Sequence, residues 1–129
     1  MASSSAGLHE SPDDLGPATI DRHRAIVSVM EELEAVDWYD QRVAAASDAE
    51  LAAILAHNRD EEKEHAAMTL EWLRRRDPAL SEKLRAYLFT EAPVTEIEVE
   101  AEHGADAESG PGPRPADGSL GIGGLKGRS

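Results

Sequence analysis

The chain has 129 residues, no cysteine and a formal net charge of −13. Disulfides and thiolate metal sites are therefore excluded, and the acidic balance argues against nucleic acid, whose phosphates need a basic surface. No apolar run is long enough to cross a membrane, and the first residues lack the basic start and apolar stretch of a secretory signal, so we expect a cytoplasmic protein.

The composition divides the chain into four segments. We expect residues 1–17 to be a flexible N-terminus and 91–116 to be a disordered acidic linker. Residues 18–90 carry helical patterns, and 117–129 hold aliphatic residues spaced by glycines. A single core of fewer than about 70–80 residues is seldom sufficient without a metal, disulfides or partner subunits. Because disulfides are excluded, metal binding and oligomerisation are the expected sources of stability.

The first predicted helix begins near Thr19, downstream of Pro17, and runs to about Ala46. Asp21 in its first turn suits the positive end of the helix dipole. Its apolar stripe has the spacings of three, four and seven that are typical of a helix. The stripe consists of Ala25, Ile26, Val29, Leu33, Val36 and Val43.

The second predicted helix spans about 48–76, with a good N-cap in the break at Ser47-Asp48 and with Pro78 beyond its end. A shorter helix follows at about 81–89. The second helix carries a narrow seam with alternating spacings of four and three, of the kind that one helix presents to another. The seam consists of Leu51, Leu55, Asn58, Glu62, His65, Thr69 and Trp72. The fold class expected is all-α, an antiparallel two-helix hairpin plus a short C-terminal helix.

The seam turns polar in its middle, at Glu62 and His65, and Glu32 lies on or beside the core stripe of the first helix. Burying an unpaired carboxylate costs several kcal/mol, so these groups must be paired, protonated or bound to metal. The alternative is that they flank the stripe and reach solvent. One inward Glu on one helix and a Glu-x-x-His on the next is the ligand pattern of di-iron carboxylate bundles.

One chain supplies only half of such a ligand set. Two hairpins packed about a two-fold axis would make a four-helix bundle with four Glu and two His ligands. Four carboxylates carry −4 and two divalent cations carry +4, so charge balances only in the dimer. Oxygen and imidazole ligands suit Fe²⁺ or Mn²⁺, with Zn²⁺ as a competitor. Two bridged irons can bind O₂ between them, and Fe²⁺ is then oxidised to Fe³⁺.

Two further features lie near this centre. Tyr39 follows Glu32 by seven residues on the same helical face, where it can hydrogen-bond a ligand or supply an electron. Glu31, Glu34 and Trp38 form a separate stripe, since Glu34 lies about 200° around the helix from Glu32. This stripe is either an ordinary solvated face or an interface or pore lining that attracts cations.

These residues resemble the encapsulated ferritins, short two-helix relatives of ferritin that act inside encapsulin nanocompartments. The resemblance is carried by Glu31-Glu32-Leu33-Glu34, by Trp38-Tyr39 and by Glu62-Lys63-Glu64-His65. It covers about residues 18–90. Separately, residues 118–125 resemble an encapsulin cargo-loading peptide, which would make 117–129 the segment that binds the shell.

The resemblance implies a ferritin-like four-helix bundle with ferroxidase activity. Glu32, Glu62 and His65 would hold two irons across a homodimer interface, with Tyr39 nearby and with Ca, Mn or Zn as expected substitutes for iron. Glu31, Glu34 and Trp38 would form a secondary metal-attracting site. The dimers would assemble into an annular decamer and deliver iron for storage in the lumen of an encapsulin nanocompartment, in a prokaryotic cytoplasm.

Two other functions stay open. One is a di-iron peroxidase or oxygenase that resembles rubrerythrin, although such proteins usually carry the full ligand set on one chain. The other is a non-enzymatic helical hairpin that serves as an assembly module. Measuring Fe²⁺ oxidation under air, with and without peroxide, separates the ferroxidase from the peroxidase or oxygenase. If the chain is an assembly module, Glu32→Ala and His65→Ala should leave iron oxidation at background and metal content unchanged.

Overall fold

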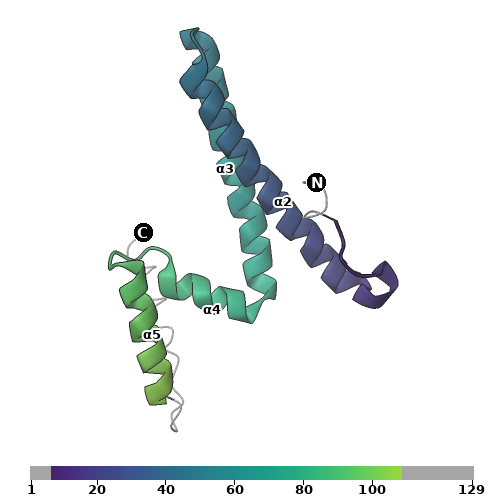
Figure 1. Ribbon diagram of the computed structural model, residues 1–129, viewed down its shortest axis with the longest axis vertical. Helices are drawn as coiled ribbons and strands as arrows, with labels where there is room; N and C mark the ends of the chain where they lie inside the picture. The colour runs from purple at the N-terminus through teal and green to yellow at the C-terminus, as the bar shows by residue number, and fades with distance from the viewer. Residues whose placement is uncertain (1–6, 109–129) are drawn as a thin grey trace. The chain divides into compact units, whose positions relative to one another are not determined.

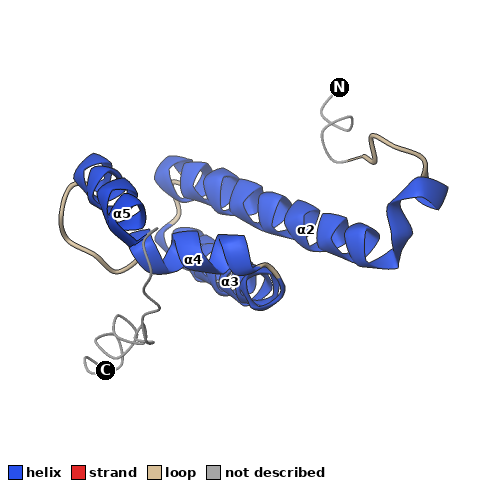
Figure 2. Cartoon of the chain, turned by 90° about the horizontal axis from the view of Figure 1, so that it is seen from below, coloured by secondary structure: helices blue, strands red, loops and turns tan. Residues whose placement is uncertain are grey.

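The structure is a computed structural model that describes residues 7–108, and in this range it is entirely helical, with no strand (Figures 1 and 2). The all-α prediction is therefore confirmed. Helices α2 and α3 form one compact unit and α4 and α5 form a second. None of these helices is long and apolar enough to span a membrane. The helices are α2 (Pro12–Ala45), α3 (Ala49–Arg76), α4 (Pro78–Tyr87) and α5 (Val94–Glu108).

Helix α2 begins earlier than the sequence analysis expected. The Ser11 hydroxyl accepts a hydrogen bond from the Asp13 amide at 3.3 Å, and Pro12 occupies the first helical position, where its missing N–H costs nothing. A kink at Gly16, with φ +82°, separates this first turn from the long helix. The residue before a proline avoids the helical region, and only glycine adopts this conformation readily. The long stretch therefore starts at Pro17, close to the expected boundary.

The turn between α2 and α3 is closed by local hydrogen bonds. The Ala46 amide donates to the Arg42 carbonyl at 2.9 Å and ends α2. The Asp48 carboxylate accepts a hydrogen bond from the Leu51 amide at 2.8 Å, so Asp48 is the cap in the break expected at Ser47-Asp48. So short a turn folds α3 back along α2, and the two helices pack as the predicted antiparallel hairpin (Figure 1).

The core of this hairpin is thin. Within residues 7–103, the only buried apolar side chains are Ala25, Ala66 and Leu73. Many large apolar side chains of the two helices are instead about half exposed. They are Ile26 (48%), Met30 (44%), Leu33 (54%), Trp38 (49%), Leu51 (47%), Ile54 (52%) and Met68 (64%). Large contiguous patches of exposed apolar side chains are typical of surfaces that contact another molecule.

Helix α4 starts three residues before the predicted boundary at 81. The Asp77 carboxylate accepts a hydrogen bond from the Leu80 amide at 3.0 Å, and Pro78 is the first helical residue. The proline that was expected to close α3 therefore also opens α4, because a first-turn position needs no N–H donor.

Helix α5 occupies part of the segment 91–116 that we expected to be a disordered acidic linker, and it corrects that expectation for residues 94–108. The Pro93 carbonyl accepts hydrogen bonds from the Glu96 and Ile97 amides at 3.0 and 3.1 Å and starts the helix. Val94, Ile97 and Ala101 have helical spacing. Ala101 faces α4 across a cavity of about 180 Å³. The remainder of the linker and the segment 117–129 lie outside the described residues.

Candidate metal centre

The hairpin brings Glu32 and Glu62 to the same height along its axis. Counted along the chain, Glu32 precedes Ala46 by as many positions as Glu62 follows Asp48. At 1.5 Å per residue, both are about 21 Å from the turn. The two carboxylates are distant in sequence but level on neighbouring helices.

Glu32 carries an unusual carboxylate oxygen. Its Oε1 atom is buried and has no hydrogen-bond partner, the one such side-chain atom in the described part of the chain. A buried carboxylate oxygen that has lost water without gaining a donor is costly. The cost disappears when a cation binds the oxygen, so this residue fits a metal ligand.

Glu62 and His65 lie side by side on α3, as their three-residue spacing requires. The Glu62 Oε1 and His65 Nδ1 atoms are 3.5 Å apart, and their side chains are 27% and 47% exposed. The other imidazole nitrogen, Nε2, lies 4.0 Å from Glu61 Oε1, and Glu61 Oε2 lies 3.6 Å from His57. The imidazole is thus open to solvent on one side and bordered by carboxylates along its own helix.

A single hairpin does not complete a metal site. Across residues 7–108, no three His, Asp or Glu side chains are grouped so that they could hold one ion. Glu32 on α2 and the Glu62–His65 pair on α3 supply oxygen and imidazole donors, the donor types that suit Fe²⁺ and Mn²⁺. The donors fit a divalent metal in kind but are too few in one chain.

Tyr39 and the outer stripe occupy different surroundings. Tyr39 is half-buried, and the Arg42 guanidinium lies 5.2 Å from its ring centroid, a cation–π contact.

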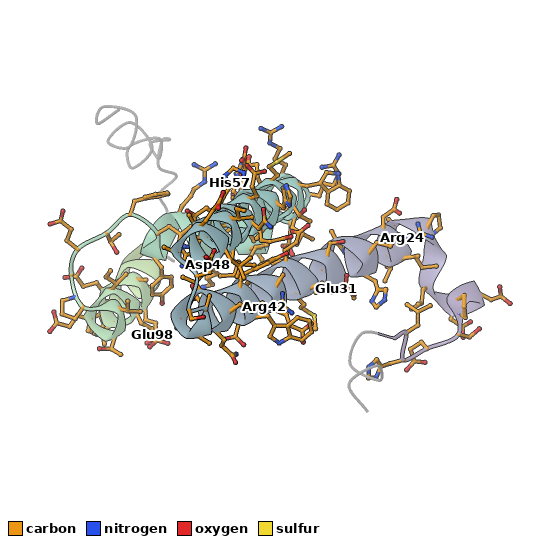
Figure 3. The ribbon with its side chains drawn as sticks, turned by 90° about the horizontal axis from the view of Figure 1, so that it is seen from above. Arg24, Glu31, Arg42, Asp48, His57 and Glu98 are labelled. Atoms are coloured by element: carbon orange, nitrogen blue, oxygen red, sulfur yellow. The ribbon has the colours of Figure 1, made fainter. Side chains whose placement is uncertain are left out.

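Glu31, Glu34 and Trp38 are exposed, and Trp38 lines a shallow hollow with Arg42. Figure 3 shows Glu31 and Arg42 along α2 and His57 on α3. The stripe is open surface in one chain.

One ion pair across the hairpin was missed by the sequence analysis. Arg59 Nη1 on α3 donates to Asp40 Oδ1 on α2 at 3.0 Å, and Arg59 Nε donates to Asp60 at 3.1 Å. These hydrogen bonds, Asp40 first, raise the pKa of Arg59, and the bond from Arg59 lowers the pKa of Asp60. Spacing along one helix carries no signal for a pair whose members belong to two different helices.

The end of α3 holds a second charged group. The Glu71 carboxylate accepts hydrogen bonds from Arg74 at 2.7 and 2.8 Å and from Arg75 at 2.7 Å, which lower its pKa to about 2. The Arg76 guanidinium lies 4.1 Å from the Trp72 ring centroid. These arginines therefore bind side chains of their own helix, besides suiting its dipole.

Comparison with known proteins places this hairpin in a family. An encapsulated ferritin-like protein of Rhodospirillum rubrum is 62% identical over 133 residues, covering 100% of this chain and 94% of the relative. A ferritin-like protein of Thermotoga maritima is 52% identical over 102 residues, covering 79% of this chain and 90% of the relative.

A solved structure and a family model agree with these relatives. The crystal structure of a Nitrosomonas europaea protein superposes with a TM-score of 0.67 at 62% identity, covering 68% of this chain and 97% of that one. The model of the EncFtn-like family matches residues 7–91, which include both helices of the hairpin. The chain is therefore a member of the EncFtn-like family, as its resemblance to the encapsulated ferritins indicated.

Proposed function

We propose that this protein is a ferroxidase that oxidises Fe²⁺ to Fe³⁺ with O₂ at a di-iron site formed between two copies of the chain. Iron is the substrate, and Glu32, Glu62 and His65 of both copies are its ligands. The observation that carries the proposal is the buried Glu32 oxygen without a partner, level with a Glu62–His65 pair that is open on one side.

The surroundings of His65 support a second copy as the missing half. Ile54, Met68 and Trp72 lie within about 60° of His65 around α3 on 3.6-residue geometry, and Ile54 and Met68 are 52% and 64% exposed. An apolar strip that flanks polar ligands on the same face is the arrangement that a bundle interface needs. Two-fold packing of this face would cover the strip and bring the two half-sites together.

The ligand set accounts for charge and electrons. Four carboxylates from two chains carry −4, which two Fe²⁺ ions neutralise. Each iron gives one electron, so the pair reduces O₂ by two electrons: two Fe²⁺, one O₂ and two protons yield two Fe³⁺ and one hydrogen peroxide. The protein's part is to hold both ions close together and to balance their charge. Tyr39 is placed on α2 one heptad beyond Glu32, where it can hydrogen-bond a ligand or supply an electron.

The relatives support the wider setting. The name of the Rhodospirillum rubrum protein describes it as encapsulated, and this supports storage of the oxidised iron in the lumen of an encapsulin shell in a prokaryotic cytoplasm. We propose residues 117–129 as the shell-binding peptide and an annular decamer as the assembly. Glu31, Glu34 and Trp38 would attract metal toward the centre, and Ca, Mn or Zn would substitute for iron there or at the di-iron site.

Aerobic addition of Fe²⁺ to the purified chain tests the activity. Iron oxidation, followed by absorbance of the ferric product, should fall to the protein-free rate in Glu32→Ala and His65→Ala. His23→Ala, a histidine substitution on the same hairpin away from the ligands, should oxidise iron as the wild type does. Equal rates in all four proteins would refute the site. A rate that needs added peroxide would favour the peroxidase alternative.

Co-expression with an encapsulin shell protein tests the setting separately. Deleting residues 117–129 should leave iron oxidation in solution unchanged, because the hairpin is untouched, and should abolish loading into the shell. Loading that survives the deletion would refute the proposed peptide but not the di-iron site.

A further inference from the structure

The structure assigns a positioning role to the Arg59–Asp40 ion pair: it sets the register of α3 along α2, and so holds Glu32 level with Glu62. This inference rests on the proposed function, since it concerns the ligands of the same site. Arg59 and Asp40 touch no reacting atom. They act through the two helices that carry the ligands.

The pair is well placed to oppose sliding. Asp40 lies nearer to the turn than Arg59 does, so the two backbones differ in height by about 7.5 Å at 1.5 Å per residue. The Arg59 side chain spans this difference and ends 3.0 Å from Asp40 Oδ1. A slide of one residue, about 1.5 Å, would move the bond outside the hydrogen-bond range of about 2.7–3.2 Å.

The arginine is itself held on its own helix. Its Nε atom donates to Asp60 Oδ1 at 3.1 Å, and the Lys63 ammonium lies 3.3 Å from the same oxygen. The Arg59 side chain is only 23% exposed. A planar guanidinium anchored through Nε presents Nη1 in a fixed direction. The bridge to α2 is therefore made by a guanidinium that is hydrogen-bonded at both Nε and Nη1.

The half of the hairpin nearer the turn has no fully buried core. The buried residues Ala25, Ala66 and Leu73 all lie farther from the turn than the metal ligands do. Between the ligands and the turn, residues 33–61 include no buried side chain. In that stretch the Asp40–Arg59 bond is the ion pair that joins the two helices.

The metal site is sensitive to such a slide. Ligand distances in a metal site are defined to about 0.2 Å, so a shift of about 1.5 Å would remove Glu32 from an ion bound by Glu62. Arg59 lies about 60° from Glu62 and about 120° from His65 around α3. Arg59 is not one of the proposed ligands, so its substitution leaves the donors themselves intact.

The test is a titration of the full-length chain with Co²⁺, whose absorption spectrum reports coordination. Asp40→Ala and Arg59→Met should each weaken Co²⁺ binding about 10-fold, the lower end of the effect of supporting residues. The double variant should be no weaker than either single, because both remove one bridge. Lys63→Met, which removes a neighbouring charge but leaves the bridge, should bind as the wild type does.

The two single variants also separate positioning from electrostatics. Asp40→Ala removes a negative charge and Arg59→Met removes a positive one. If the charges acted only through their field, the first would weaken Co²⁺ binding and the second would strengthen it. Weaker Co²⁺ binding in both variants supports the positioning role. Wild-type affinity in Asp40→Ala, opposite effects of the singles, or additive losses in the double variant would overturn it.

Two further comparisons keep the positioning role testable and separate it from the proposed function. If Arg59→Met does not fold, Asp40→Ala decides alone, because its side chain is 56% exposed and alanine favours the helix. If wild type and Glu32→Ala bind Co²⁺ equally, the proposed function itself fails. If they differ and Asp40→Ala matches the wild type, the proposed function stands and the positioning role falls.

Discussion

Metal should control the association of two chains, because in the proposed site each chain supplies only half of the ligands. A dimer with two ions gains stability at both sites, whereas separated chains bind them weakly. At a free metal concentration of 100 times the site Kd, each ion contributes about 2.7 kcal/mol. Two ions contribute about 5.4 kcal/mol, so the dimer dissociation constant should fall by about 10⁴-fold.

Sedimentation velocity under anaerobic conditions measures this effect, with Fe²⁺ added at increasing concentration. The wild-type chain should move from slower to faster species as iron is added. Glu32→Gln keeps the shape of the side chain but removes its charge, and it should shift far less. Sedimentation profiles that do not change with added metal, or that shift equally in Glu32→Gln, would refute the shared site.

Three smaller predictions concern single side chains. Arg74→Met should return the Glu71 pKa from about 2 toward 4.5 in a carboxyl NMR titration; since the folded pKa is the lower one, the stabilisation is present above pH 4.5 and is lost as the pH falls toward 2. Met68→Lys should weaken metal-linked dimerisation but leave the helical circular dichroism unchanged, because this side chain is 64% exposed in one chain. Gly16→Ala should lower the Tm by a few degrees, since a φ of +82° costs a side chain about 1–3 kcal/mol; an unchanged Tm would mean that the kink relaxes.

Local chemistry explains what the sequence could predict. The Asp48 cap and the Glu62–His65 neighbourhood depend on residues three apart on one helix, so the helical period alone places them. The sequence also places Glu32 and Glu62 equally far from the turn, once the turn is located. Whether the two residues stay level depends on the contacts between the helices.

Two features could not be predicted from the sequence: helix α5 and the Arg59–Asp40 ion pair. The acidic composition after residue 91 led us to expect no helix there, although Val94, Ile97 and Ala101 have helical spacing and lie in α5. The Arg59–Asp40 ion pair joins two helices, and the distance between the helices decides whether the arginine side chain can reach the carboxylate. A long side chain can reach several partners, so the tertiary structure decides which partner it binds.

The same residue, Glu32, would destabilise the isolated hairpin and favour the proposed metal-bound assembly. Glu32 keeps a carboxylate oxygen buried without a partner, which destabilises the single chain by an amount on the order of 1–3 kcal/mol. A leucine there would relieve this cost but would leave nothing for a cation to bind. In the proposed assembly, a second copy and two metal ions would remove the same penalty and would also cover the half-exposed apolar strip beside His65. The residue that destabilises the single chain would then be the one that favours the metal-bound dimer, as expected when function and stability oppose each other at a site.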